Sequence, residues 1–178
     1  MKYAPINLNQ AAILKLRARI LAQEPKKASM EETFIEIVEF RLASETYGIE
    51  SLFIREIHPL KDFTLLPGIP PFVLGITSVR GQILSVVDLK KFFNLPDNGL
   101  CELNKLIILH SCRMEFGILA DAIIGTRSVP LDAIRLPPAT ITGIGAEYLK
   151  GVTGERIIIL DAGKILDDKK IIVNQETE

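Results

Sequence analysis

The stretch GITSVRGQILSVVDLKKFF, residues 75–93, predicts a complete unit of local structure. A tight turn is expected at Arg80-Gly81, because the glycine supplies the backbone freedom that such a turn needs. The apolar and β-branched residues at 83–87 favour a strand with little exposed surface. Asp88 then occupies an N-cap position, where its carboxylate can accept from the first helical amides. We therefore expect a strand, a turn with an exposed arginine at its corner, a second strand and a short helix.

The composition excludes several classes of protein. The 178 residues include 21 Lys plus Arg and 22 Asp plus Glu, so no net field favours nucleic acid or an anionic membrane. Hydrophobic residues make up 48% of the chain, enough for an ample core and some apolar surface for partners. No apolar run approaches the roughly 18 residues of a membrane helix. The first residues, 1–5, lack the apolar core of a signal peptide. Cys101 and Cys112 are too few for a disulfide framework or a zinc site, which favours free thiols in a reducing cytoplasm.

The chain repeats itself at an interval of about 70 residues. Three landmarks recur in the same order. YGI at 47–49 recurs as FGI at 116–118, and LP at 66–67 recurs as LP at 136–137. The third landmark is a glycine, an arginine and an aspartate, found as Gly75, Arg80 and Asp88 and again as Gly151, Arg156 and Asp161. Halves of this size are too small to bury a generous core alone. They are therefore expected to share an apolar interface, with a groove at the seam between them. Many short strands with Gly/Pro turns complete the prediction of two small β-barrels packed side by side.

Two further segments carry expectations about local structure. From Phe34 the pattern alternates, with apolar residues at 38, 40 and 42 on one face and Glu39 and Arg41 on the other. A turn at 45–46 and a second strand reaching Ile57 are expected to follow.

The N-terminal segment 9–24 predicts an amphipathic helix. Ile13, Leu16 and Ile20 recur at helical spacing, the opposite face is basic, and Pro25 ends the run. Two alternatives stay open: this helix packs onto its own domain, or it docks on a partner or a neighbouring copy.

No residue pattern indicates catalysis. The sequence has no phosphate-binding G-x-x-x-x-G-K-[ST] loop, no G-x-S-x-G elbow and no H-E-x-x-H zinc helix. His58 and His110 lack a matching cluster of cysteines or carboxylates. Asp88 and Asp161 could be imagined as an acid–base pair, but their shared N-cap context favours a structural role. We expect neither an enzyme nor a cofactor or metal.

Binding is the remaining class of function. Arg80 lies at a hairpin corner from which its guanidinium could point into a groove, and Glu56 lies on a preceding strand from which it could pair with Arg80. An exposed pair of this kind adds little stability, so its value would lie in orienting a contact residue. A protein adaptor predicts an apolar seam with Arg80 at its rim. A small-ligand-binding barrel or an enzyme would instead need clustered polar groups at the seam.

An ordered set of short motifs carries a resemblance to a known family. The set is YGI at 47–49, REI at 55–57, LP at 66–67, Pro70, GITSVRG at 75–81, VDL at 87–89, FGI at 116–118, AD at 120–121, YLKGV at 148–152 and ILD at 159–161. Together these residues resemble the CheW family of chemotaxis coupling proteins over about 34–173. The resemblance implies a mainly β fold of two SH3-like five-stranded barrels sharing a hydrophobic interface, with short helices. Outside the match, the residues predict a helical extension and linker at 1–33 and a tail at 174–178. An exchange of strands between the two halves stays open.

The same resemblance implies a function. Members of the family are cytoplasmic adaptors that join the tips of chemoreceptors (methyl-accepting chemotaxis proteins) to the regulatory domain of a CheA-type histidine kinase, in membrane-associated arrays that can include self-association. Neither binding to nucleic acid nor insertion into the membrane is expected. A paralogue serving pilus-based motility or another chemosensory-like pathway is the alternative, motivated by the added N-terminal helix.

The family's functional positions carry over to a few residues. Arg80 matches the arginine of an Asn-Leu-Arg-Gly turn associated with receptor contact, and Glu56 matches the glutamate that partners it. Ile54 and Gly75 match positions that flank the receptor groove. The turn here reads Ser-Val-Arg-Gly, with Val79 before the arginine. Serine can still satisfy a local backbone amide, so the turn is expected to persist while the receptor preference shifts.

Overall fold

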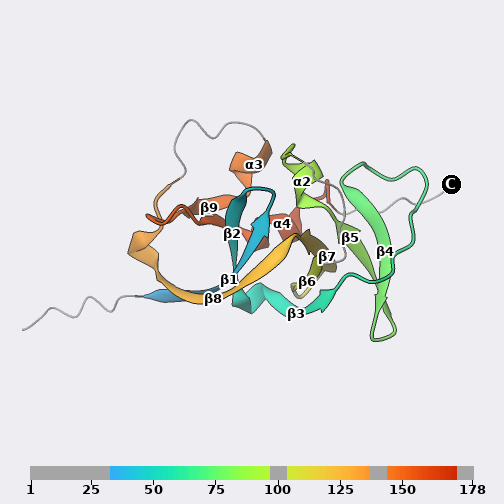
Figure 1. The fold of residues 1–178 in the computed structure, drawn as a ribbon, viewed down its shortest axis with the longest axis horizontal. Coiled ribbons are helices and arrows are strands. Elements are labelled where there is room, and N and C mark those ends of the chain that lie inside the picture. The colour runs from blue at the N-terminus through green and yellow to red at the C-terminus, as the bar shows by residue number, and fades with distance from the viewer. Residues whose placement is uncertain (1–32, 97–103, 137–143, 172–178) are drawn as a thin grey trace, which may run out of the picture. The chain divides into compact units, whose positions relative to one another are not determined.

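The computed structural model describes residues 33–96, 104–136 and 144–171, and within them ten strands form two five-stranded sheets (Figure 1). The strands are β1 (Phe34–Leu42), β2 (Glu45–Glu50), β3 (Ile54–Pro59), β4 (Val73–Val79), β5 (Gln82–Val87), β6 (Lys105–His110), β7 (Glu115–Ala120), β8 (Ala122–Pro130), β9 (Leu149–Val152) and β10 (Ile158–Leu160). The short helices are η1 (Ser51–Phe53), α2 (Leu89–Phe92), η2 (Leu131–Ala133), α3 (Ile144–Glu147) and α4 (Ala162–Asp167). The predicted fold class, mainly β with two five-stranded barrels, is confirmed.

The two barrels do not coincide with the two repeated halves of the sequence. Barrel A has the strand order β8-β1-β2-β10-β9 and barrel B the order β3-β6-β7-β5-β4. Barrel A therefore combines the first two strands of the domain with its last three, whereas barrel B is continuous in sequence. Both barrels are built on one plan, since β2 pairs in parallel with β10 and β7 pairs in parallel with β5.

The chain passes from barrel A to barrel B at η1, which corrects one expectation from the sequence. The predicted second strand reaching Ile57 is two strands in different sheets, because β2 ends at Glu50 and β3 begins at Ile54 after the 3-10 turn. The turn before β2 lies at residues 43–44 rather than 45–46. Ala43 adopts a left-handed φ of 53° there, so the strand can start at Glu45.

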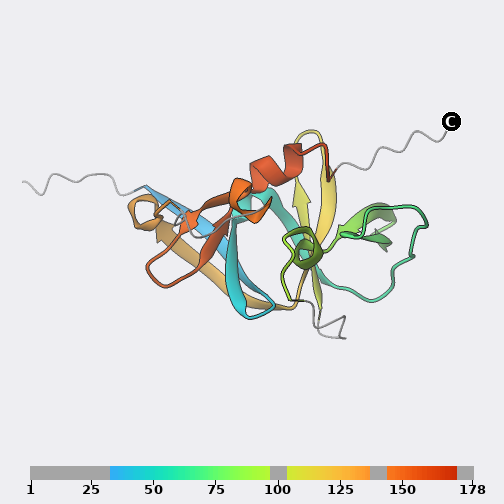
Figure 2. The same ribbon diagram turned by 90° about the horizontal axis from the view of Figure 1, so that it is seen from above.

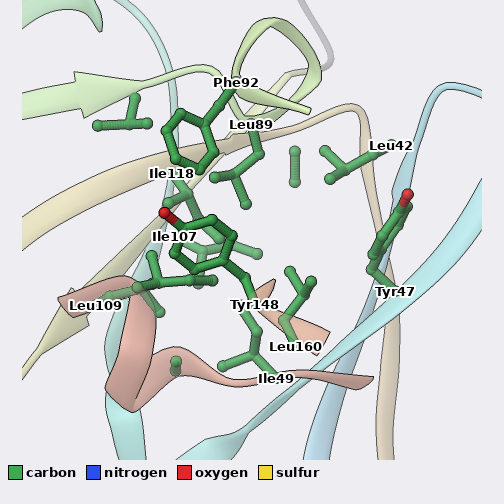
Figure 3. Packing of buried hydrophobic residues seen from close by; sticks show 14 of the residues in the cluster. Leu42, Tyr47, Ile49, Leu89, Phe92, Ile107, Leu109, Ile118, Tyr148 and Leu160 are labelled. Carbon is green, nitrogen blue, oxygen red and sulfur yellow. The ribbon is translucent and has the colours of Figure 1, made fainter. Parts of the chain in front are cut away.

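The largest hydrophobic cluster lies between the barrels and is shared by them (Figure 3). Barrel A contributes Ile49 and Leu160 among others, barrel B contributes Ile107 and Ile118, and all four are fully buried. Burying an aliphatic side chain of this size stabilises a fold by about 1.5–3 kcal/mol. The helices α2 and α4 close this core, and Figure 2 shows α4 over the junction of the two barrels. The shared apolar interface expected from the repeat is confirmed.

Both short helices start at the aspartates expected to cap them. Asp88 Oδ1 accepts from the backbone N–H of Lys90 at 3.0 Å, and Asp161 Oδ1 accepts from that of Lys164 at the same distance. The aspartate amides also donate to equivalent carbonyls, Asp88 to Phe72 and Asp161 to Tyr148. The repeat in sequence is thus a repeat of strand, cap and helix in space.

Glu39 is buried, although the alternation in β1 places it on the face opposite the apolar residues. Its residue is only 5% exposed, because β1 is paired along both edges, with β8 and β2, and residues 37–40 are all buried whichever face they lie on. A bulge at Glu39/Phe40 interrupts the pairing of β1 with β8. Arg127 Nε lies 2.5 Å from Glu39 Oε1 and balances its charge, although that oxygen accepts no hydrogen bond of good geometry. Arg127 also contacts Glu155 on the β9–β10 loop.

The return crossing, from barrel B to barrel A, is fixed by Asp121 between β7 and β8. Its carboxylate accepts from the Ala43 N–H at 2.7 Å and from the Asn104 side-chain amide at 3.2 Å. Lys90 Nζ, which is almost fully buried, lies 2.9 Å from the same carboxylate. One aspartate therefore ties together the β1–β2 turn, α2 and the start of β6.

Candidate functional site

The hairpin of β4 and β5 turns at Arg80 and Gly81, as the sequence predicts. Both residues have positive φ angles, 51° and 83°, the combination that a two-residue type I′ turn requires and that matches the twist of the flanking strands. The turn carries the Arg80 side chain to the surface of barrel B, where it is 72% exposed. The turn therefore presents an arginine rather than burying it.

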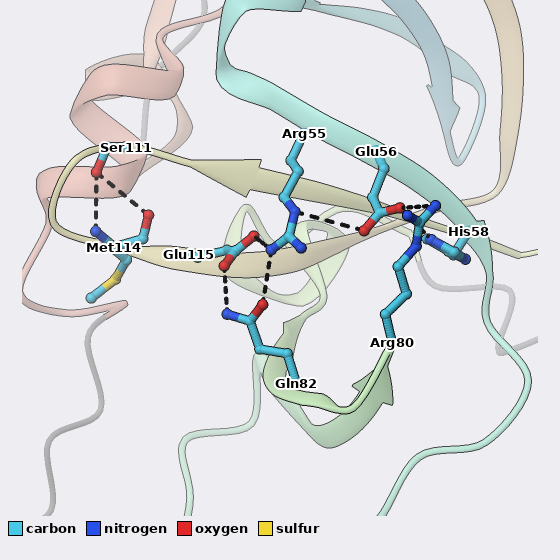
Figure 4. A network of polar contacts seen from close by, with 8 residues as sticks. All are labelled: Arg55, Glu56, His58, Arg80, Gln82, Ser111, Met114 and Glu115. Atoms are coloured by element: carbon cyan, nitrogen blue, oxygen red, sulfur yellow. Dashed lines mark hydrogen bonds and ion pairs between the residues drawn. The ribbon is translucent and has the colours of Figure 1, made fainter.

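Arg80 forms the predicted ion pair with Glu56 on β3 (Figure 4). Arg80 Nη2 lies 2.9 Å from Glu56 Oε2, and His58 Nε2 lies 2.8 Å from the same oxygen. The contact with His58 lowers the pKa of Glu56 from its usual value, partial burial opposes this, and the charge of Arg80 adds to the lowering. Glu56 is thus held as a carboxylate that orients the exposed guanidinium.

Three residues that the sequence analysis did not single out extend this cluster. Arg55 Nη1 donates to Gln82 Oε1 at 2.8 Å and also to Glu115, while Gln82 donates to the second oxygen of Glu115 at 2.7 Å (Figure 4). Glu115 follows a turn in which Ser111 Oγ accepts from the Met114 N–H at 3.1 Å. Arg55, Gln82 and Glu115 are far apart in the sequence, and no motif links them, so only the fold shows that they meet.

The other predicted site residues lie beneath this surface or outside the described residues. Val79 is 8% exposed and belongs to the interior of barrel B. Gly75 is buried on β4 against the loop that carries Thr64. Ile54 is half-buried and packs against the shared core at the start of β3. The predicted accessory residues Ile13, Leu16 and Ile20 lie outside the described residues.

The hollow nearest Arg80 belongs to barrel B. A cavity of about 360 Å³ is lined by residues that include His58, Leu60, Val79, Arg80 and Leu106. Two further cavities, of about 280 Å³ each, are likewise lined by residues of one barrel. None of these three lies at the seam, where the side chains of the shared core are packed together. The polar cluster and the cavity beside Arg80 therefore both belong to barrel B.

Two properties of the described residues bear on the class of site. Within them, no group of three or more His, Cys, Asp or Glu side chains is placed to hold a metal ion. No helix in the same part of the chain is long and apolar enough to cross a membrane. The chemistry that the cluster does provide is recognition by oriented guanidinium groups.

Comparisons with known proteins agree with this arrangement. The family model described as "CheW-like domain" matches residues 36–170. A chemotaxis protein CheW from Treponema pallidum is 33% identical over 143 residues, covering 76% of this chain and 84% of that protein. Protein FrzA from Myxococcus xanthus is 30% identical over 132 residues, covering 71% and 82%. The crystal structure of the scaffolding protein TtCheW from Thermoanaerobacter tengcongensis superposes with a TM-score of 0.68 at 28% identity, covering 78% of this chain and 96% of that one. The chain therefore belongs to the CheW family.

Proposed function

We propose that this chain is a non-catalytic adaptor of bacterial chemotaxis signalling. It couples the cytoplasmic tips of chemoreceptors to a CheA-type histidine kinase, and it acts in the cytoplasm at membrane-associated receptor arrays. The observation that carries the proposal is the exposed Arg80 held by Glu56 on a chain of the CheW family. The apolar packing at the seam also favours an adaptor over a small-ligand-binding barrel or an enzyme, which would need clustered polar groups there.

In this proposal the receptor is recognised and no bond is made or broken. A helical hairpin of the receptor tip lays apolar side chains along the groove that the resemblance implies between the barrels. Ile54 supports this location, because it packs on the shared core only two residues before Glu56. Arg80 then gives the contact its orientation and specificity.

The kinase would be bound through a different surface. The regulatory domain of a CheA-type kinase carries a barrel of the same family, and an exposed barrel edge or apolar rim could meet it. Weak contacts of this kind, including self-association, add up through effective concentration when they are repeated across an array. Kinase output changes because receptor binding favours one arrangement of the assembly over another.

Charge reversal at Arg80 tests the proposal. Arg80→Glu should leave the far-UV circular dichroism and the melting temperature close to wild type, because the side chain is largely exposed. Its affinity for a receptor tip fragment from the same cell should fall by at least about tenfold, with binding to the kinase regulatory domain retained. Arg41→Glu, at an exposed position on β1 of barrel A, is the matched control. A wild-type chain that binds neither the receptor tip nor the kinase domain would overturn the proposed function.

A second candidate is a paralogue that serves a pilus-motility or other chemosensory-like pathway. The similarity to protein FrzA, at 30% identity over most of both chains, favours it. Parallel pull-down experiments with chemotaxis receptors and with receptors of the other pathway from the same cell would separate the two. Selective capture of one class assigns the chain to that pathway.

The N-terminal segment is a separate proposal within this function. Its apolar stripe at Ile13, Leu16 and Ile20 would give a partner an accessory helical contact. Deleting residues 1–30 should then weaken binding to that partner and leave the melting temperature nearly unchanged. A large fall in melting temperature would mean that the helix belongs to the core of its own domain.

A further inference from the structure

Arg55 and Arg80 meet at one carboxylate. Arg80 Nη2 lies 2.9 Å from Glu56 Oε2, and Arg55 Nε lies 3.7 Å from Glu56 Oε1. The two arginines come from different elements, β3 and the β4–β5 turn, so they are adjacent only in the folded chain. Glu56 therefore brings two guanidinium groups to the same part of the surface of barrel B.

Arg55 is held from the other side by β5 and β7. Its Nη1 is shared between Gln82 and Glu115, which are themselves hydrogen-bonded at 2.7 Å. The hydrogen bonds that Arg55 donates to other described residues come from Nη1, and its Nε adds the ion pair with Glu56. A guanidinium that is held in place in this way loses less conformational entropy when it binds a further group than a freely rotating one does.

The charges of the cluster are arranged in two levels. The carboxylate side chains are mostly covered, with Glu56 15% and Glu115 19% exposed, whereas Arg55 and Arg80 are 40% and 72% exposed. The outer level is therefore cationic, although the four charges sum to zero. A partner approaching this face meets guanidinium N–H groups first, and these groups match the geometry of a carboxylate.

We propose that Arg55 is a second contact residue of the receptor-facing surface, and that Arg55 and Arg80 together bind acidic side chains of the receptor's helical hairpin. Gln82 and Glu115 are positioning residues for Arg55. This inference rests on the proposed function, because it takes the receptor tip as the occupant of the surface. It adds the chemistry that the surface selects, which is a carboxylate on the partner helix.

A double-mutant cycle tests the inference with the full chain and a cytoplasmic hairpin fragment of a chemoreceptor from the same cell. The chain is used as wild type, Arg55→Gln, Glu115→Gln and Arg41→Gln, the last being an exposed control on barrel A. The receptor fragment is used as wild type and with the acidic residues at its tip replaced by glutamine. The dissociation constant is measured for each pair at about 0.05 M and about 0.3 M salt, since screening weakens contacts between exposed charges.

The expected result is a loss that depends on the receptor's acidic residues. Arg55→Gln should weaken binding to the wild-type tip by about tenfold at low salt, and by less than about twofold for the neutralised tip. Glu115→Gln should give a smaller loss, because the charge of Arg55 remains but its position is released. Arg41→Gln should match wild type. Equal binding by Arg55→Gln and wild type, or an equal loss with both receptor tips, would overturn the inference while leaving the proposed function intact. No binding of the wild-type chain to the tip would overturn the inference, and the proposed function would fall as well if the wild-type chain also failed to bind the kinase regulatory domain.

Discussion

Gly75 lies against the carbonyl group of Thr64, so closely that a Cβ at this position would stand 2.1 Å from the carbonyl oxygen. The approach is fixed by two backbone hydrogen bonds between Thr64 and Ile76, of 2.7 and 3.0 Å. Barrel A repeats the relationship, since a Cβ on Gly151 would stand 2.5 Å from the carbonyl oxygen of Arg135. The glycine that recurs in the two halves of the sequence is thus required where a loop crosses the strand.

Gly75→Ala should destabilise the fold severely. The new Cβ would meet a backbone atom that cannot swing away, and the φ of 148° at this position is one that residues with a side chain rarely adopt. We expect a loss of roughly 2 kcal/mol or more in the free energy of unfolding, measured by urea denaturation. The control is Gly154→Ala, where a Cβ would have no atom within 4 Å and the change should be small. Similar stability of the two variants would show that β4 can move away from the loop.

Removing Arg127 should cost much more stability than removing its exposed partner Glu155. Arg127→Gln leaves Glu39 buried without a cation, so we expect the melting temperature to fall by at least about 5 °C. Glu155→Gln removes the exposed partner of the same arginine and should change it by less than about 2 °C. Scanning calorimetry on both variants checks which of the two lowers the melting temperature more. An effect of Glu155→Gln as large as that of Arg127→Gln would contradict it.

Acidification should release the Glu56 cluster. The contact with His58, opposed by partial burial and assisted by the charge of Arg80, keeps the pKa of Glu56 below its usual 4.5 in the folded chain. A lowered pKa means that the stability Glu56 contributes is complete above pH 4.5 and is lost as the pH falls through the folded-state pKa. The melting temperature of Glu56→Gln should therefore lie below that of wild type near neutral pH, and the difference should shrink progressively as the pH falls below 4.5. A difference that persists at acid pH would mean that another property of the glutamate is responsible.

Removing the cap of α4 should have a moderate effect. Asp161→Ala leaves the Lys164 amide without its side-chain acceptor, at a cost of about 1 kcal/mol in the free energy of unfolding. Asp161→Asn keeps an acceptor oxygen and should recover most of this loss. If asparagine proves as damaging as alanine, the charge of Asp161 and its contact with Lys164 at 3.6 Å matter more than the cap.

The features predicted correctly from the sequence depend on local chemistry. The turn at Arg80-Gly81 and the caps at Asp88 and Asp161 each follow from short segments. The pairing of Arg80 with Glu56 is the exception, because it joins two distant segments and was expected from the family resemblance. The internal repeat also allowed the shared core to be predicted, because each half alone offers too little apolar surface to bury.

The features that the sequence analysis missed depend on which strands become neighbours. Periodicity assigns residues to a strand but not a strand to a sheet, so β2 and β3 were expected to be continuous. The burial of Glu39 was not predicted, because nothing in β1 reveals that Arg127 will lie beside it. Arg55, Gln82 and Glu115 were not recognised for the same reason, since their contacts join three strands of barrel B.

The strand order of the two barrels has a consequence for how the chain folds as it leaves the ribosome. All of barrel B lies between residues 54 and 120, so it can form before synthesis ends. The first two strands of barrel A must wait for β8, β9 and β10, with their edges unpaired and open to misassembly in the meantime. A chain that ends after residue 120 therefore contains all five strands of barrel B, together with two strands of barrel A that lack their partners β8 and β10.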